Sequence, residues 1–254
     1  MQAATTIDEV LLQLNDIIAQ CKTNQSPLGY FAALYRNVTA AVQKGIQAGS
    51  FQDNARMEKL DVVFANRFLA AYYAYHSNAI CSGCWKKSFD AGRNANLIVL
   101  QHLLSGINAH INMDLGLAAA AIAPGDEIFA LEQDFAMIND VLAIITGNVQ
   151  RQLGQVSWGM FLFSNISKNR EKALINFSID MSRKAAWATA LKYALIPQDS
   201  WLNNLNDLDH SVSTLADGVL NPGRWSTFLI KVVRFTEQKD VKKIIEILEK
   251  AEPA

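Results

Sequence analysis

The chain has few cysteines, and its opening residues lack the features expected of a signal peptide. Three cysteines in 254 residues do not indicate a disulfide framework, because such frameworks use dense and usually even sets of cysteines. The opening residues, MQAATTIDEV, have neither the basic nor the apolar region that a secretory signal peptide requires. The expected location is therefore the reducing environment of the cytoplasm.

An excess of charge of one sign is lacking as well. The 23 Lys and Arg residues balance 24 Asp and Glu residues, which leaves a net charge of −1. A near-neutral chain without a basic block gives no electrostatic reason to expect nucleic acid as a partner. The longest apolar stretches are interrupted by Gln101, His102, His110 or Asp114, so we expect no stable membrane insertion.

Several familiar catalytic signatures are missing. The sequence has no P-loop, no GxGxxG turn and no GxSxG nucleophile elbow, the motifs typical of nucleotide binding and serine hydrolysis. It also has no DDxxD cluster, no HExxH and no Glu-x-x-His pair. Function therefore has to be argued from the placement of individual side chains.

Half of the residues are hydrophobic, and their spacing is helical nearly throughout. In the first segment they follow the i, i+3, i+4, i+7 rhythm of an amphipathic helix, at Ile7, Val10, Leu11, Leu14, Ile17 and Ile18. No segment alternates as a strand would, and no repeat or linker divides the chain. The sequence predicts one all-α domain over residues 1–254, with eight to ten helices around a buried central helix.

Capping and helix-breaking residues predict where these helices begin and end. Thr6 with Glu9 fits a capping box, Asp53 can cap a third helix, and APGD at 123–126 separates two long helices. After a first helix that begins near residue 7, the expected helices cover about 27–48, 54–76, 85–91, 95–121, 127–152, 168–195, 199–220, 225–235 and 238–250.

The expected central helix contains the stretch QHLLSGINAHINMDLG, in which polar residues recur every fourth position. They form two ridges, His102, Gly106, His110 and Asp114 on one, and Asn108 and Asn112 on the other. The flanking sequence is apolar on every side, a pattern typical of a helix buried inside a protein. These polar groups are therefore expected to be buried, where each needs a partner. Gly106 leaves a gap that a neighbouring backbone or a ligand can approach.

Three interpretations of His110 and Asp114 are open. One is a satisfied internal hydrogen-bond network. Another is a site for a divalent metal such as zinc or iron, since an H-x-x-x-D pair places two ligands one helical turn apart, with an oxygen ligand from Glu58 or Asp61 on the third helix. The last is direct acid–base work without a metal, with His102 and Asp61 assisting.

Asn108 and Asn112 of the central helix are candidates for substrate binding, and two further groups of residues join them. Asn66 and Arg67 lie among large apolar residues on the third helix, and Arg67 can pair with Asp61, Asp114 or Asp180 or hold an anionic group. On the late long helix one face presents Asn176, Asp180, Arg183 and Trp187. This face and the central helix are expected to meet across a pocket between helices.

Cys81 and Cys84 form a single CxxC beside Trp85. One such pair is half of a structural zinc site at most, because zinc takes four ligands there. A thioredoxin-type role is not favoured either, since the βαβ setting is absent. We interpret the segment as a loop with incidental thiols.

Four strings of the sequence together resemble a bacterial family catalogued as domain of unknown function 5995. They are LGYFAALYRNVT (28–39), RMEKLDVVFANRF (56–68), LQHLLSGINAHINMDLG (100–116) and ALINFSIDMSRKAAW (173–187). The likeness extends from about Ile7 to Phe235. It implies a shared helical fold and no particular activity. It also implies a shared pattern that contains His102, Gly106, Asn108, His110, Asn112 and Asp114, together with Asp61, Asn66 and Arg67, and that leaves the CxxC out.

The leading hypothesis is a small-molecule enzyme with its pocket between buried helices. His110 would act as general acid and base, and Asp114 would orient it or share a metal with it. Arg67 and Arg183 would hold an anionic or polar group of a partly apolar substrate, with hydrolysis, isomerisation and cyclisation all open. The alternative is a non-catalytic helical module that binds an apolar ligand or a partner protein.

Overall fold

The computed structural model describes residues 2–160, 170–222 and 224–250, without the side chains of 139–146, 170–179 and 224–229. The described residues form α-helices and no β-strand, apart from one isolated bridge between Ser157 and Glu237. The helices are α1 (Ile7–Thr23), α2 (Leu28–Gln47), α3 (Asn54–His76), α4 (Gly83–Ala91), α5 (Val99–Asn108), α6 (Gly116–Ile122), α7 (Glu127–Val156), α9 (Arg170–Ala194), α10 (Leu202–Leu220), α11 (Arg224–Thr236) and α12 (Val241–Leu248). A π-helical segment, η1 (Ala109–Leu115), and a short 3₁₀ segment, η2 (Gln198–Ser200), complete them.

The prediction of an all-α fold is confirmed, and so are most of the helix starts. The Thr6 hydroxyl accepts a hydrogen bond from the Glu9 N–H at 3.2 Å, and the Asp53 carboxylate accepts one from the Arg56 N–H at 2.9 Å. These bonds satisfy backbone donors that a helix leaves free in its first turn. Gly49, with φ of +69°, ends the second helix in the left-handed conformation that glycine adopts without strain.

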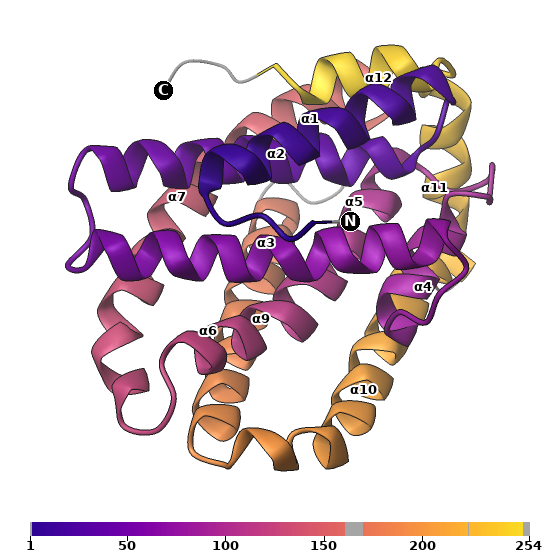
Figure 1. Ribbon diagram of the computed structural model, residues 1–254. Helices are drawn as coiled ribbons and strands as arrows, with labels where there is room; N and C mark the ends of the chain where they lie inside the picture. Colours follow the sequence, from indigo (N-terminus) through magenta and orange to yellow (C-terminus); the bar gives the residue numbers. More distant parts are fainter. Residues whose placement is uncertain (1, 161–169, 223, 251–254) are drawn as a thin grey trace.

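A continuous rod made of α5, η1 and α6 lies at the centre of the molecule. It contacts α2, α3, α4, α7, α9 and α10, and nearly all of its residues are buried. Figure 1 shows α1, α2 and α3 lying across the upper half of the view, with α12 beside α1 and with α9 and α10 below them. Of the described helices, none combines the length and the hydropathy that crossing a bilayer requires.

The rod differs from the uniform α-helix expected over 95–121. It begins at Val99, and its middle turns, Ala109–Leu115, are π-helical. A π-helix bonds each N–H to the carbonyl five residues back, is rare, and frequently occurs at functional sites. His110, Asn112 and Asp114 all lie in this segment, so the polar ridge occurs where the backbone departs from regular geometry.

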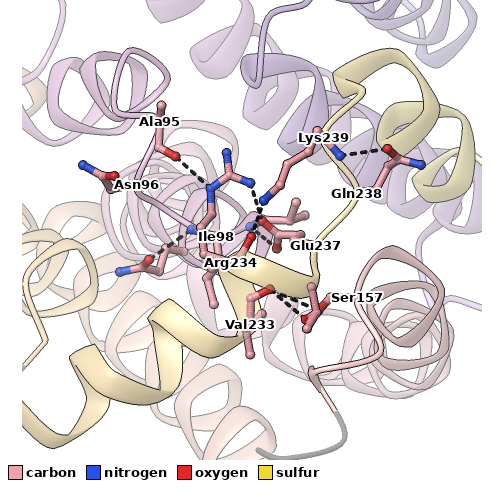
Figure 2. Close-up of polar contacts among 12 residues, drawn as sticks. Ala95, Asn96, Ile98, Ser157, Val233, Arg234, Glu237, Gln238 and Lys239 are labelled. Atoms are coloured by element: carbon pink, nitrogen blue, oxygen red, sulfur yellow. Dashed lines mark hydrogen bonds and ion pairs between the residues drawn. The ribbon is translucent and has the colours of Figure 1, made fainter.

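The beginning of the rod is capped from the far end of the chain. Glu237, which is 5% exposed, accepts a hydrogen bond from the Val99 N–H at 2.9 Å. Figure 2 shows Arg234 between Glu237 and the Ala95 carbonyl, with its Nε donating to that carbonyl at 2.7 Å. Burial raises the Glu237 pKa to about 7, against the lowering effect of the Val99 bond. Because the Glu237 side chain accepts the Val99 N–H bond, it caps the N-terminal end of the rod, where the helix dipole is positive.

Two glycines let neighbouring helices approach the rod closely. A Cβ at Gly106 would lie 2.5 Å from the ring of Phe31, so the gap expected there is filled by a side chain and not by a neighbouring backbone or a ligand. A Cβ at Gly116 would lie 2.5 Å from the Ala186 carbonyl oxygen on α9 and 2.7 Å from Cβ of Thr189. Since the nearest obstacle at Gly116 is backbone, the contact between α6 and α9 requires glycine.

We predict that Gly116→Ala destabilises the fold by about 1–3 kcal/mol, the usual cost of overpacking a filled core. Urea denaturation followed by circular dichroism measures the change. The matched control is Gly154→Ala on an exposed part of α7, where an added Cβ meets nothing within 4 Å and alanine should stabilise the helix by up to about 1 kcal/mol. A Gly116→Ala variant as stable as Gly154→Ala would contradict the close packing of α6 on α9.

Candidate functional site

An elongated cavity runs along one side of the rod, between α2, α3, α7 and α9. The centre of a water molecule can occupy about 120 Å³ of this cavity. The whole empty space, including its opening to solvent, has a volume of about 1140 Å³. Its described lining is mostly aliphatic and aromatic, with Tyr35, Asp61, His110, Gln150 and Arg183 as the polar exceptions. A mainly apolar cavity with a few convergent polar groups is the usual form of a small-molecule site.

His110 is held at the cavity wall by Asp114, which lies behind it. The residue is 3% exposed, and its Nδ1 lies 3.3 Å from the Asp114 Oδ2. A carboxylate can only accept, so we assign the donated proton to Nδ1. The other ring nitrogen, Nε2, is buried and has no hydrogen-bond partner among the described residues.

Asp114 is a buried carboxylate with three donors around it. The Arg67 Nε lies 3.1 Å from its Oδ1, and the Trp85 indole N–H donates to its Oδ2 at 2.8 Å. With His110 as the third donor, Asp114 has the pairing that a buried charge needs. Of the three carboxylates considered for Arg67 from the sequence, the structure selects Asp114.

Aromatic rings surround the His110 imidazole. The ring of Phe64 stacks on it, with centroids 3.7 Å apart and planes at 7°, and Tyr35 meets it edge-on at 4.3 Å. Burial lowers the His110 pKa, and the bond to Asp114 opposes that shift. The imidazole is therefore neutral at neutral pH, and its Nε2 carries a lone pair.

Asp61 is a second titratable group at the same cavity. It is 7% exposed, its Oδ2 has no partner among the described residues, and burial raises its pKa to about 7, with a smaller contribution from the charge of Glu58. The Tyr35 pKa is raised well above its ordinary value, first by burial and next by the charge of Asp61. The structure thus brings Asp61 into one cavity with His110, as expected.

Arg183 projects from α9 to the same cavity. It is 5% exposed, and its guanidinium lies 4.7 Å from the ring centroid of Phe135. One Nη donates to the Phe135 carbonyl, whereas Nε has no partner among the described residues. Burial lowers the Arg183 pKa to about 10, so the group is still a cation at neutral pH.

Comparison with protein families identifies the family of the chain. The model of a family described as "Family of unknown function (DUF5995)" matches residues 7–222. The chain belongs to this family. No curated protein and no solved structure matches the chain. The matched span of this DUF5995 member includes every described residue that lines the cavity.

Three of the predicted binding residues of this DUF5995 member are engaged within the protein. The Asn66 amide exchanges two hydrogen bonds of 2.8 Å with the backbone of Ala4. Asn108 donates to the Val212 carbonyl of α10 at 2.9 Å and accepts from Asn112 at 2.9 Å. Asn66 thus holds the N-terminal segment, and the asparagine ridge joins the rod to α10.

His102 is buried away from the cavity. It meets the ring of Tyr30 edge-on at 5.7 Å, and its pKa is lowered to about 4 by burial first and by the charge of Arg234 second. The structure therefore does not bring His102 together with His110 and Asp61.

The remaining candidates lie on α9. Trp187 is outside the cavity lining and packs on Phe135, with centroids 4.9 Å apart. It therefore supports the ring on which Arg183 lies. Asn176 lies on α9, but its side chain is outside the described part of the structure.

Of the expected metal ligands, Glu58 is not brought together with His110 and Asp114. Glu58 is exposed on α3, whereas His110 and Asp114 are buried and bonded to each other. Within the described ranges, no group of three or more His, Cys, Asp or Glu side chains is arranged to hold a metal ion.

Of the CxxC, the Cys84 thiol is buried, and the backbone N–H of Cys84 donates to the Asp209 carboxylate at 2.8 Å. Asp209 thus caps α4.

The sequence reasoning missed two residues that position the site. The sequence shows Trp85 only as a neighbour of the CxxC, although its indole N–H donates to Asp114. Glu237, which caps the rod, lies beyond the family match. A buried tryptophan commonly finds a hydrogen-bond partner for its N–H, and this rule could have indicated a polar partner for Trp85. Nothing in the sequence indicates that Glu237 caps the rod.

We predict that Asp61→Asn changes how stability depends on pH. With a folded pKa of about 7 against an ordinary value of 3.8, folded Asp61 keeps a proton that the unfolded chain has lost. Its contribution to the free energy of unfolding therefore falls as pH rises from about 4 to about 7 and is constant above that. Asparagine cannot ionise, so the variant should gain on the order of 2 to 3 kcal/mol over wild type between pH 5 and pH 8.

Urea denaturation of both proteins at pH 5, 6, 7 and 8 measures this difference. Asp16→Asn, a change at an exposed position of α1, is the control and should show a constant difference from wild type. A difference between Asp61→Asn and wild type that does not vary with pH would show that the carboxyl titrates normally.

Proposed function

We propose that this protein is an acid–base enzyme that moves a proton within a small, partly apolar molecule bound in the cavity. One observation carries the proposal. Two residues that line the same cavity, His110 and Asp61, each have a buried polar atom without a hydrogen-bond partner among the described residues, Nε2 and Oδ2 respectively. Buried polar atoms in native proteins nearly always have partners. Of the nine such unpartnered side-chain atoms among the described residues, four belong to residues that line this cavity, the other two being Tyr35 Oη and Arg183 Nε. Their gathering at one cavity favours a ligand that completes their hydrogen bonds.

His110 has the role of the base. Asp114 accepts the Nδ1 proton, which leaves Nε2 with a lone pair and fixes the orientation of the ring. Arg67 and Trp85 in turn fix Asp114, so three residues behind the histidine serve to position one nitrogen. The stacked ring of Phe64 excludes water from that side of the imidazole.

Asp61 has the role of the acid. A pKa of about 7 makes a substantial fraction of the carboxyl protonated at neutral pH, the condition in which it can donate. In the proposed step, a C–H proton of the substrate passes to His110 Nε2 and another carbon takes a proton from Asp61. His110 then loses its proton to solvent at the open side of the cavity, and Asp61 regains one there.

The lining favours isomerisation among the reactions that the sequence left open. Among the described lining residues there is no Ser, Thr, Cys or Lys, which are the usual nucleophiles of covalent hydrolysis. A proton shift requires no nucleophile and benefits from an apolar site that excludes water. The cytoplasm is part of the same proposal, since the three cysteines are free.

One observation favours a second function, the binding of an apolar ligand without chemistry. Much of the polar ridge is satisfied within the protein, with Asn108 and Asn112 paired to each other and Asp114 to its three donors. Such a network also serves to set the register of buried helices. In that case His110 would stabilise the rod and take no part in a reaction.

We predict that the protein catalyses deuterium exchange from D₂O into a β,γ-unsaturated ketone or carboxylic acid in a panel of such compounds. His110→Gln should slow the incorporation at least 100-fold, since a positioned base typically contributes a factor of 10² to 10⁴. Mass spectrometry of the recovered compound measures the incorporated deuterium.

The matched control is His76→Gln, at an exposed position whose ring contacts the Tyr72 carbonyl; it should retain the wild-type rate. Circular dichroism of each variant verifies that it is folded. Equal incorporation by wild type and folded His110→Gln would contradict the proposed base. Binding of the panel compounds by wild type without any incorporation would favour the non-catalytic function.

A further inference from the structure

Arg67 and Arg183 were both candidates to hold an anionic group, and the structure separates them. Arg67 is bonded to Asp114 and does not line the cavity. Arg183 lines the cavity and is the one cationic side chain among the described lining residues. Among the described lining residues, it is therefore the group with which an anion in the cavity would pair.

Arg183 has no carboxylate within ion-pair distance among the described residues. Asp180, one turn earlier on α9, is exposed and pairs with Lys184 at 2.8 Å. What Arg183 has instead is the carbonyl and the ring face of Phe135. Both contacts orient the guanidinium, and neither neutralises its charge.

A buried cation without a counterion is costly to desolvate. Proteins keep such a group where a bound anion completes it, and arginine is the side chain best shaped to pair with a carboxylate. The buried Nε of Arg183, which has no partner among the described residues, is a donor suited to that purpose.

The shape and the charge of the cavity restrict the chemical class of ligand that it can bind. The lining extends along the rod from Leu100 to Leu115, a span of roughly 20 Å at the rise of a helix, and is apolar over most of that length. One guanidinium balances one negative charge. From these observations we propose that the substrate of the proposed enzyme is an amphiphile with an apolar chain along the rod and a single carboxylate held by Arg183.

Competitive binding of two probes of equal chain length tests this inference. The inference rests on the proposed function only in calling the bound amphiphile a substrate. Dodecanoate and dodecan-1-ol, each below its aggregation limit, would displace the neutral fluorophore N-phenyl-1-naphthylamine from the full-length protein. We expect wild type to bind dodecanoate at least about tenfold more tightly than dodecan-1-ol, the factor that 1.4 kcal/mol gives.

Arg183→Met removes the charge and keeps most of the side-chain volume, so the variant should remain folded. It should bind dodecan-1-ol as wild type does and lose the preference for dodecanoate. Arg183→Lys should retain part of the preference, since it retains the charge. The matched control, Lys184→Met, removes the neighbouring cation on the exposed face of α9 and should leave the preference unchanged.

The inference is overturned if wild type shows no preference, if it binds neither probe, or if Arg183→Met keeps the preference. It is also overturned if Lys184→Met lowers the preference as much as Arg183→Met, because general electrostatic attraction would then be the cause. Its failure is distinguishable from failure of the proposed function. A carboxylate preference without deuterium exchange would identify a carrier of anionic amphiphiles, whereas exchange without the preference would leave the acid–base chemistry in place.

Discussion

The buried carboxylate of Asp114 is the group on which the rest of the site depends. It is 3% exposed, and a charge at that depth is tolerated only because Arg67, Trp85 and His110 all direct donors at it. These donors come from α3, α4 and η1, so one side chain joins three elements of the fold. The same bonds determine which nitrogen of His110 carries the proton, and they connect the stability of the rod with the chemistry at the cavity.

The cavity and the network behind it have different roles. Behind the rod, polar groups are paired and hold helices together, as Asn108 does with α10. In front of it, His110 Nε2, Asp61 Oδ2 and Arg183 Nε are buried without partners among the described residues. Two arginines show the same division, since Arg67 neutralises a carboxylate of the protein and Arg183 is left for a ligand.

Much of the fold was predictable because helix caps and apolar periodicity are local signals. Asp53 and the spacing of apolar residues gave α3 nearly to the residue. The buried polar ridge was also predictable, since its apolar flanks require burial. The π-helical turn at Ala109–Leu115 was not, because its residues follow the same spacing as those of a regular α-helix and no local signal marks the change. Neither the choice of Asp114 as the partner of Arg67 nor the exposure of Glu58 could be predicted, since both depend on how α3 is rotated about its axis.

The central claim is that Asp114 holds His110 in one neutral tautomer, with Nε2 unprotonated in the cavity. Nitrogen-15 NMR of the histidine-labelled protein at pH 7 tests this most directly, because the shifts of Nδ1 and Nε2 report which of them carries a proton. The account predicts a protonated Nδ1 and an unprotonated Nε2 for His110, assigned by the loss of its signals in His110→Gln. A protonated Nε2, either in the other tautomer or in a charged imidazolium, would contradict it.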